Sequence, residues 1–269
     1  MIESKRMLLD EDLVELRSAY EVLENPGFAV RLQGMLGAPL EQGMKYLPAN
    51  WRGGIQKATE GALRRALDVA TSSFSDRKES GAASNALHKL LAAGSGAVGG
   101  AFGLPALAVE LPVSTVIMLR SIADVARSQG EDIRSLEAKL ACLEVFALGG
   151  KEPGDDSTEA GYYAVRAVLT QQLGEVARYV AKAGIADSSA PVLMRFIGSI
   201  ASRFGIVVSE KAMATAVPLI GAAGGAIINA LFIDHFQGVA RAHFTVRRLE
   251  RIYGAGLVQS EYQKIADGH

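Results

Sequence analysis

Four ionisable side chains in apolar surroundings are the residues of this chain best suited to chemistry: Glu110, Glu144, His235 and His243. Carboxylates and imidazoles on facing helices can exchange protons or bind metal ions inside helical bundles. Glu110 and His235 are the candidate metal pair, because each follows a long uncharged run. The spacings match neither the Glu-x-x-His pattern of di-iron bundles nor His-Glu-x-x-His. The sequence therefore defines a candidate polar cluster but identifies no reaction and no cofactor.

His243 belongs to a stripe of residues with helical spacing. The stripe recurs at alternating intervals of three and four residues and comprises Asn229, Phe232, Phe236, Val239, His243, Val246, Glu250 and Tyr253. This pattern predicts one continuous face of a helix. A polar side chain on a buried face costs free energy unless it has a partner. We therefore expect His243 to be largely buried and hydrogen-bonded.

Four arginines occupy another arc of the same helix: Arg241, Arg247, Arg248 and Arg251. They lie within roughly 120° of one another at 100° per residue. Such a cluster can bind phosphates or acidic lipid headgroups. The alternative is intramolecular pairing with Glu250 and other acids, in which case the arginines stabilise the fold and contact no lipid.

Two long runs without charge must position these groups. Residues 90–109 and 212–233 are uncharged over 20 and 22 positions, and they contain the similar motifs GAVGGA and GAAGGA at positions 96 and 221. Small residues let helix backbones approach closely. The two runs are therefore predicted to pair as a glycine-rich hairpin or crossing pair, with Glu110 and His235 at one level. The glycines expected at this contact are Gly96, Gly99, Gly100, Gly221, Gly224 and Gly225.

The length of these runs leaves two interpretations open. Each reaches the length of a bilayer span, but 90–109 consists mostly of Ala and Gly, which transfer weakly into lipid. The runs form either the core of a soluble bundle or a hairpin that enters or lies on a membrane. The formal GxGxxG at 94–99 is not a dinucleotide signature, because no strand–helix–strand unit surrounds it.

The rest of the chain predicts an all-α fold. No convincing run alternates between apolar and polar residues, and helices are expected at about 11–23, 52–74, 113–128, 133–148, 160–183 and 191–204. The architecture is a multi-helix bundle built around the two Gly/Ala-rich apolar helical segments. Residues 1–75 are assigned to an N-terminal helical region and 76–269 to the main helical domain, packed as one unit.

The composition restricts the possible partners and the cellular compartment. The chain has 269 residues and a net charge of −1, so no basic field favours nucleic acid. Cys142 is the single cysteine, so no intrachain disulfide can form and a reducing compartment is expected. The first residues carry acids early and do not resemble a secretory signal.

Several blocks of the chain resemble the EcsC family of bacterial proteins. These include ELPVSTVIMLRSIADVARSQGED, CLEVFALGG and RFGIVVSEKAMATAVPLIGAAGGAIINALFIDHF, and the likeness covers roughly residues 70–262. The family is named for a protein encoded beside the two components of an ABC transport system. The resemblance implies a membrane-linked helical protein and supplies no catalytic residue.

Two functions remain in view. The first is a non-enzymatic accessory protein of the cytoplasm, peripheral to the inner face of the cytoplasmic membrane. Its expected partner is anionic lipid or a membrane protein complex. The alternative is an enzyme or metal-binding bundle that uses the inward Glu and His side chains.

Overall fold

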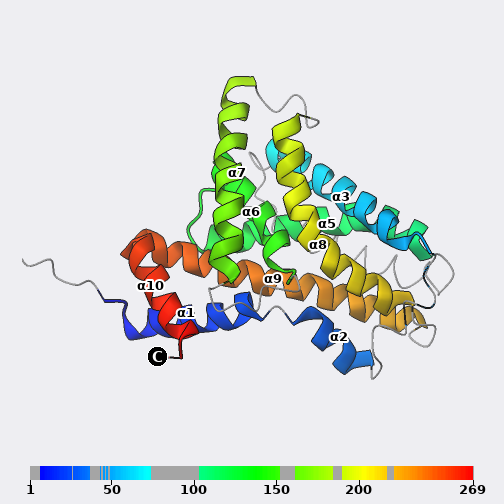
Figure 1. Cartoon of the computed structure of the whole chain (residues 1–269), viewed down its shortest axis with the longest axis horizontal. Coiled ribbons are helices and arrows are strands. Elements are labelled where there is room, and N and C mark those ends of the chain that lie inside the picture. Colours follow the sequence, from blue (N-terminus) through cyan, green and yellow to red (C-terminus); the bar gives the residue numbers. More distant parts are fainter. Residues whose placement is uncertain are drawn as a thin grey trace, which may run out of the picture.

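The computed structural model describes residues 7–25, 27–36, 43, 45, 47, 49–73, 103–151, 161–183, 190–216 and 221–268. These residues form nine helices and no strand, which confirms the all-α prediction (Figure 1). The helices are α1 (Asp10–Glu24), α2 (Phe28–Leu36), α3 (Trp51–Ser73), α5 (Gly103–Ser128), α6 (Leu136–Leu148), α7 (Gly161–Ala183), α8 (Pro191–Ala216), α9 (Gly221–Tyr253) and α10 (Ala255–Ala266).

Helix α6 lies at the centre of the bundle. It packs against α3, α5, α7, α8 and α9, and every residue from Leu140 to Leu148 is buried. The helix begins after Ser135, whose side chain accepts a hydrogen bond from the Ala138 N–H at 3.1 Å. Ser135 is thus the N-cap, and the helix begins at Leu136 rather than at the expected residue 133. A helix apolar all round suits this central position.

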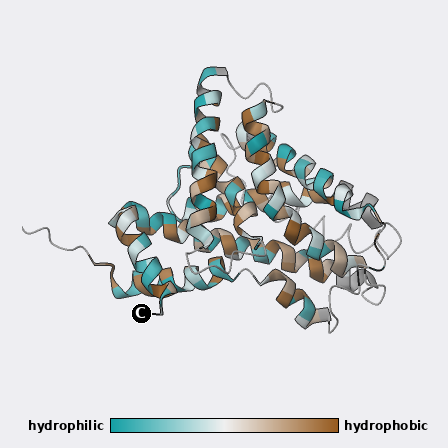
Figure 2. Cartoon of the chain, in the orientation of Figure 1, coloured by the Kyte–Doolittle hydropathy of each residue, from teal (hydrophilic) through white to brown (hydrophobic). Residues whose placement is uncertain are grey.

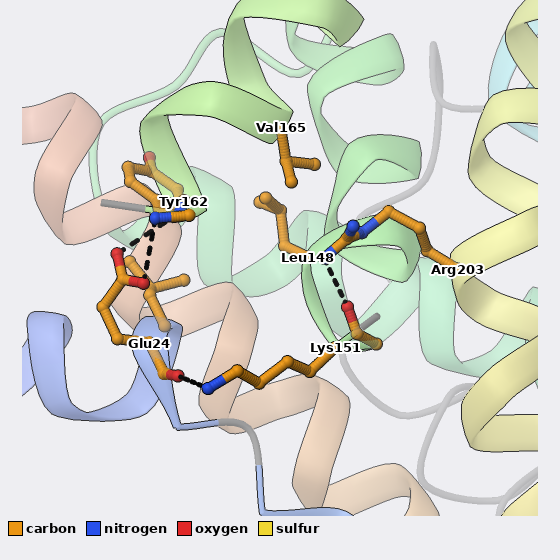
Figure 3. A pocket seen from close by; sticks show the side chains of 9 residues that line it. Glu24, Leu148, Lys151, Tyr162, Val165 and Arg203 are labelled. Carbon is orange, nitrogen blue, oxygen red and sulfur yellow. Dashed lines mark hydrogen bonds between the residues drawn. The ribbon is translucent and has the colours of Figure 1, made fainter. Parts of the chain in front are cut away.

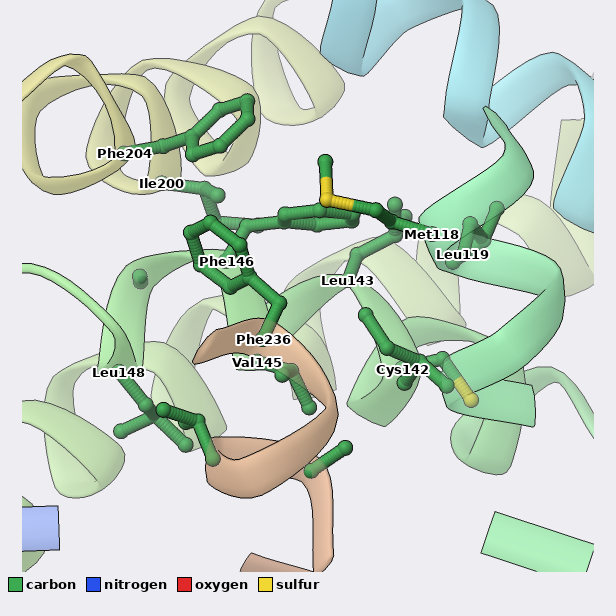
Figure 4. Close-up of a cluster of buried hydrophobic side chains, with 14 of the residues drawn as sticks. Met118, Leu119, Cys142, Leu143, Val145, Phe146, Leu148, Ile200, Phe204 and Phe236 are labelled. Atoms are coloured by element: carbon green, nitrogen blue, oxygen red, sulfur yellow. The ribbon is translucent and has the colours of Figure 1, made fainter. Parts of the chain in front are cut away.

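Helix α9 is the longest element and carries the predicted stripe. Phe232, Phe236, Val239 and His243 are all essentially inaccessible to solvent, which confirms the stripe as a buried face. The Phe236 ring packs against Phe146 of α6 and Phe204 of α8 at centroid distances of 5.3 and 5.4 Å (Figure 4). The aromatic rings therefore join the three central helices.

Cross-helix contacts fix the directions of the helices. Glu110 of α5 pairs with Lys211 of α8, whose ammonium lies over the Phe232 ring of α9. Further along, Ser121 of α5 accepts a hydrogen bond from Gln237 of α9. Thus α5 and α9 run in the same direction. Helix α8, which precedes α9 in the chain, runs in the opposite direction. The first turns of α5 and α9 and the last turns of α8 consequently lie at one end of the molecule.

The start of α5 and the end of α8 also differ from the sequence predictions. Helix α5 starts at Gly103 and continues through Pro112, not after it. Proline removes one helical hydrogen bond, but the neighbouring Leu111 and Ser114 are buried, and this packing holds the helix together. Helix α8 extends past 204 to Ala216, so the 212–233 run is divided between two helices.

The glycine pairing expected at the centre stays a prediction, because Gly96, Gly99 and Gly100 lie outside the described residues. Gly221 and Gly224 belong to the first turn of α9. A Cβ added at Gly225 would have no described atom within 4 Å. The most extensive helix pair among the described elements is α3 with α5. The small residues Ala62, Ala66 and Ala70 are fully buried on α3.

Candidate functional site

The four residues of the predicted polar cluster occupy three different places. Glu110 forms an ion pair with Lys211, whose Nζ lies 2.9 and 3.0 Å from the two carboxylate oxygens. His235 instead bonds through Nε2 to the Gly149 carbonyl oxygen at 2.9 Å. The expected meeting of Glu110 and His235 is therefore wrong, because the first faces α8 and the second faces the end of α6. In the described part of the chain, no group of three His, Cys, Asp or Glu residues could hold a metal ion.

Two glycines at the end of α6 make the His235 contact possible. A Cβ at Gly149 would lie 2.5 Å from the Phe236 ring and 3.0 Å from His235 Nε2. A Cβ at Gly150 would overlap the Arg203 backbone of α8. Burial lowers the pKa of His235 to about 4, so the ring is neutral at physiological pH. His235 is a core histidine that ties α9 to α6.

His243 is the centre of a buried hydrogen-bonded network. Its Nδ1 lies 3.0 Å from the Tyr162 hydroxyl of α7, and it has no exposed surface, which confirms the prediction for this residue. Arg166 donates to the same hydroxyl at 3.3 Å, so Tyr162 links the His243 ring to the Arg166 guanidinium. Burial holds the pKa of His243 well below its usual value. Nε2 itself has no hydrogen-bond partner.

Arg166 links this network to the end of the stripe. Its guanidinium binds both oxygens of Glu250 at 2.6 and 2.7 Å, and Tyr163 donates to Glu250 at 3.1 Å. The Arg166 and Glu250 side chains are only 17% and 11% exposed. A buried bidentate pair of this kind has both charges compensated. The polar positions 243 and 250 of the stripe therefore have partners, as expected of core residues.

Glu144 of α6 is the least compensated group in the core. Glu144 is 2% exposed, and its Oε1 atom has no hydrogen-bond partner. Burial raises the pKa of Glu144 to about 7, while Arg247 and Arg166 act in the opposite direction. The same two arginines are the charged neighbours of His243. Glu144 and His243 thus share one electrostatic neighbourhood, unlike Glu110 and His235.

Three of the four predicted arginines are paired within the molecule. Arg247 binds Glu131 at 2.7 Å, Arg248 binds Glu15 of α1 at 2.6 Å, and Arg251 also contacts Glu131. Arg241 is exposed, and no ion pair to it is found among the described residues. Of the two alternatives that the sequence left open, intramolecular pairing therefore describes Arg247, Arg248 and Arg251.

A small cavity lies beside the network, where α1, α6, α7 and α8 meet (Figure 3). Its volume is about 20 Å³, and Glu24, Lys151, Tyr162 and Arg203 are among its lining residues. This is room for one water molecule. The Glu24 carboxylate accepts hydrogen bonds from the Gly161 and Tyr162 N–H groups at 3.1 and 3.3 Å and so fixes the start of α7. No sequence pattern pointed to Glu24, Tyr162 or Arg166, because their partners are distant in the chain.

The beginning of α9, at the other end from this network, is apolar and partly exposed to solvent. Five apolar side chains on three helices are exposed, with Val30 and Met35 on α2, Val109 and Val113 on α5 and Ile227 on α9. Val30 and Val109 are 72% and 74% exposed. Figure 2 shows the apolar colour along α2, the short helix beneath α9. We call these five residues the apolar end.

Basic and aromatic residues lie near the start of α3. Gly43 lies against Met213 and Gln56 lies near Gly205, so α3 begins next to the last turns of α8. Lys45 and Arg52 are exposed there. The Arg52 guanidinium lies 5.6 Å from the centre of the Trp51 ring, which is partly buried. The start of α3, which packs against α8, therefore carries exposed cations and one tryptophan.

Among the described helices, α8 alone is long and apolar enough to cross a membrane, and 44% of its apolar window is buried in the protein. Core helices of soluble proteins have the same properties, so the length of α8 carries no conclusion by itself.

The fold and the network define an all-α bundle whose core holds a buried, paired set of ionisable groups. The chain belongs to the EcsC protein family, whose model matches residues 31–249. The family match begins at residue 31, whereas the resemblance seen in the sequence began at about residue 70. Helices α2 and α3 are therefore part of the family region, whereas α1 and α10 lie outside it. No curated protein and no solved structure matches the chain.

Proposed function

We propose that the protein is a non-enzymatic accessory protein that attaches to the inner face of the cytoplasmic membrane through its apolar end. The proposal is carried by the exposure of five apolar side chains on α2, α5 and α9, which we take to form one contact surface. Single exposed apolar residues are ordinary, whereas contiguous groups of them mark interaction surfaces.

Simple energetics favour a shallow, reversible attachment. Full burial of a Val or Met side chain contributes about 1.5–3 kcal/mol, and each nearby cation contributes about 1 kcal/mol on an anionic surface. Lys45 and Arg52 are exposed near the start of α3, and a tryptophan such as Trp51 suits the headgroup level. The anionic lipid expected from the sequence thus fits this end better than the second half of α9. There, Arg247, Arg248 and Arg251 already have carboxylate partners.

Vesicle sedimentation tests the proposal. We expect the purified protein to sediment with vesicles that contain about one third phosphatidylglycerol, less so at high salt because exposed charges are screened. The double variant Val30→Glu/Met35→Glu should lose this binding. Val168→Glu is the matched control, because Val168 is also exposed but lies on α7. Equal recovery of the double variant and the control, or no sedimentation of the wild type, contradicts the proposal.

A metal-binding or enzymatic role is the second candidate, favoured only by the unpartnered Glu144 and His243 atoms. Elemental analysis of purified protein tests it. Less than about a tenth of an equivalent of any transition metal, unchanged in His243→Ala, removes the metal version.

A further inference from the structure

Glu144 occupies an unusual position for a carboxyl group. It lies on α6, the central helix, and one of its oxygens is buried without a hydrogen-bond partner. A buried polar atom without a partner costs about 1–3 kcal/mol, and more when it is charged. Such an atom therefore requires a physical account.

The surroundings of Glu144 contain two arginines held by other carboxylates. The groups that share its electrostatic neighbourhood are Arg247 and His243 of α9, Arg166 and Tyr162 of α7, and Glu137 and Cys142 of α6 itself. Helices α3, α5 and α8 also pack against α6, and their described residues add no charge to this set.

One of these arginines can change partner at low cost. Arg247 binds Glu131 and also reaches Glu137 of α6 at 3.4 Å. Arg251 binds the same Glu131 carboxylate. If the Arg247 guanidinium left, Glu131 would still have a cation beside it. Arg166 differs, because Glu250 has no second arginine or lysine among its recorded partners in the described part of the chain. Arg247 is thus the mobile partner and Arg166 the fixed one.

We infer that Glu144 is a proton-binding residue of the core whose ionisation draws the Arg247 guanidinium from Glu131 to Glu144, leaving Glu131 to Arg251. When Glu144 is protonated, the carboxyl is neutral and Arg247 stays on Glu131. When the proton leaves to solvent, the bare carboxylate needs a cation, and Arg247 is the one that can move.

Two observations support this exchange. Burial raises the pKa of Glu144 to about 7, which places its ionisation in the physiological range. Glu144 Oε1 is buried without a hydrogen-bond partner, so the core leaves this carboxyl group able to take a new one. The exchange would loosen the contact of α9 with the segment before α6, where Glu131 lies.

A double-mutant cycle at two pH values tests the inference. At pH 6, Glu131→Gln removes the closer of the two carboxylate partners of Arg247 and should lower the Tm by several degrees. At pH 8.5, Arg247 has moved, so the penalty should be smaller by about 3 °C or more. In a Glu144→Gln background, the Glu131→Gln penalty should be the same at both pH values. An undiminished penalty at pH 8.5 in the presence of Glu144 overturns the inference.

Glu210→Gln is the matched control for this cycle. Burial also raises the pKa of Glu210 to about 7, but no charged neighbour contributes to that shift. Glu210→Gln should therefore leave the pH dependence of the Glu131→Gln penalty intact. If it removes that dependence as Glu144→Gln does, the coupling is not specific and the inference fails.

Carbon-13 NMR of the glutamate carboxyls supplies a second measurement that does not depend on unstable variants. The Glu144 resonance should titrate near pH 7, and the Arg247 Nε resonance should move with the same midpoint. Titration of Glu144 near 4.5, or an Arg247 signal that ignores pH, contradicts the exchange.

Discussion

The two halves of α9 differ in whether their side chains have partners within the protein. The second half, from His243 to Tyr253, carries ionisable groups in the core, and its buried charges at Arg247 and Glu250 are matched by opposite charges from other elements. The first half has no ionisable side chain before Asp234 and leaves Ile227 exposed beside an uncovered α2. The charged side chains of the second half thus have partners within the chain, whereas the first half leaves an apolar side chain exposed.

This difference separates stability from interaction. Paired charges inside a protein hold neighbouring helices in one arrangement, and removing one partner is costly. Exposed apolar side chains contribute little to the fold, so they are free to bind another surface. Changes in the second half of α9 should therefore reduce stability, whereas changes at the apolar end should alter binding alone. The predictions below test this contrast, from the largest effect to the smallest.

The largest effect is expected at Glu250. Glu250→Ala leaves the Arg166 guanidinium buried and unpaired, so the free energy of unfolding should fall by about 3–5 kcal/mol. Glu175→Ala is the control, because the Glu175–Arg195 pair is 38% and 67% exposed. Exposed pairs contribute less than about 1 kcal/mol. Chemical denaturation of both variants measures the difference, and similar losses would contradict the contrast.

The sequence was informative about this half of α9 and less so about its partners. Helical spacing alone identified the buried stripe and placed His243 on it, because a 3.6-residue period reports which face is buried. The same spacing says nothing about what lies opposite. Tyr162 and Arg166 stand more than 80 positions away, and only the tertiary fold brings them to the stripe.

For the apolar end, the sequence showed the composition but not the arrangement of the helices. Its uncharged composition was evident, yet the division of the 212–233 run between α8 and α9 was not predicted. The offset between the two glycine motifs suggested a meeting of Glu110 and His235. Their actual partners, Lys211 and Gly149, follow from helix directions that periodicity does not encode. Arginine spacing likewise could not distinguish lipid binding from the pairing with Glu131, Asp12 and Glu15.

Glu144→Gln should reveal the least compensated charge of the core. The pKa of Glu144 is raised from 4.5 to about 7 in the folded protein. The folded state therefore binds the proton more tightly, and stability is lost as the pH rises from about 4.5 to about 7. This rise of the pKa corresponds to a loss of about 3 kcal/mol. Relative to wild type, Glu144→Gln should gain about that much between pH 4.5 and pH 8. Parallel pH curves of the two proteins would refute the assignment.

Gly149→Ala should destabilise the junction of α6 and α9. The added Cβ would lie 2.5 Å from the Phe236 ring, so a packed aromatic side chain must move. Overpacking of this kind costs about 1–3 kcal/mol. Gly225→Ala, in the first half of α9, meets open space and should instead stabilise the helix by up to about 1 kcal/mol. Thermal unfolding distinguishes the two signs, and a stable Gly149→Ala variant would mean that α6 and α9 are further apart.

The smallest effect on stability is expected at Arg52, near the start of α3. Arg52 is exposed and its recorded partner is the Trp51 ring, so Arg52→Glu should change the free energy of unfolding by no more than about 0.5 kcal/mol. Its effect on vesicle binding should be larger. Replacing a favourable charge by an unfavourable one near an anionic surface changes binding by about 2 kcal/mol, or roughly thirtyfold at low salt. Arg247→Glu should show the opposite profile, with a large loss of stability because it places a carboxylate beside Glu131. Sedimentation and denaturation of both variants complete the comparison. If Arg247→Glu reduced vesicle binding without loss of stability, the second half of α9 would be the membrane contact and the division between the two halves would not hold.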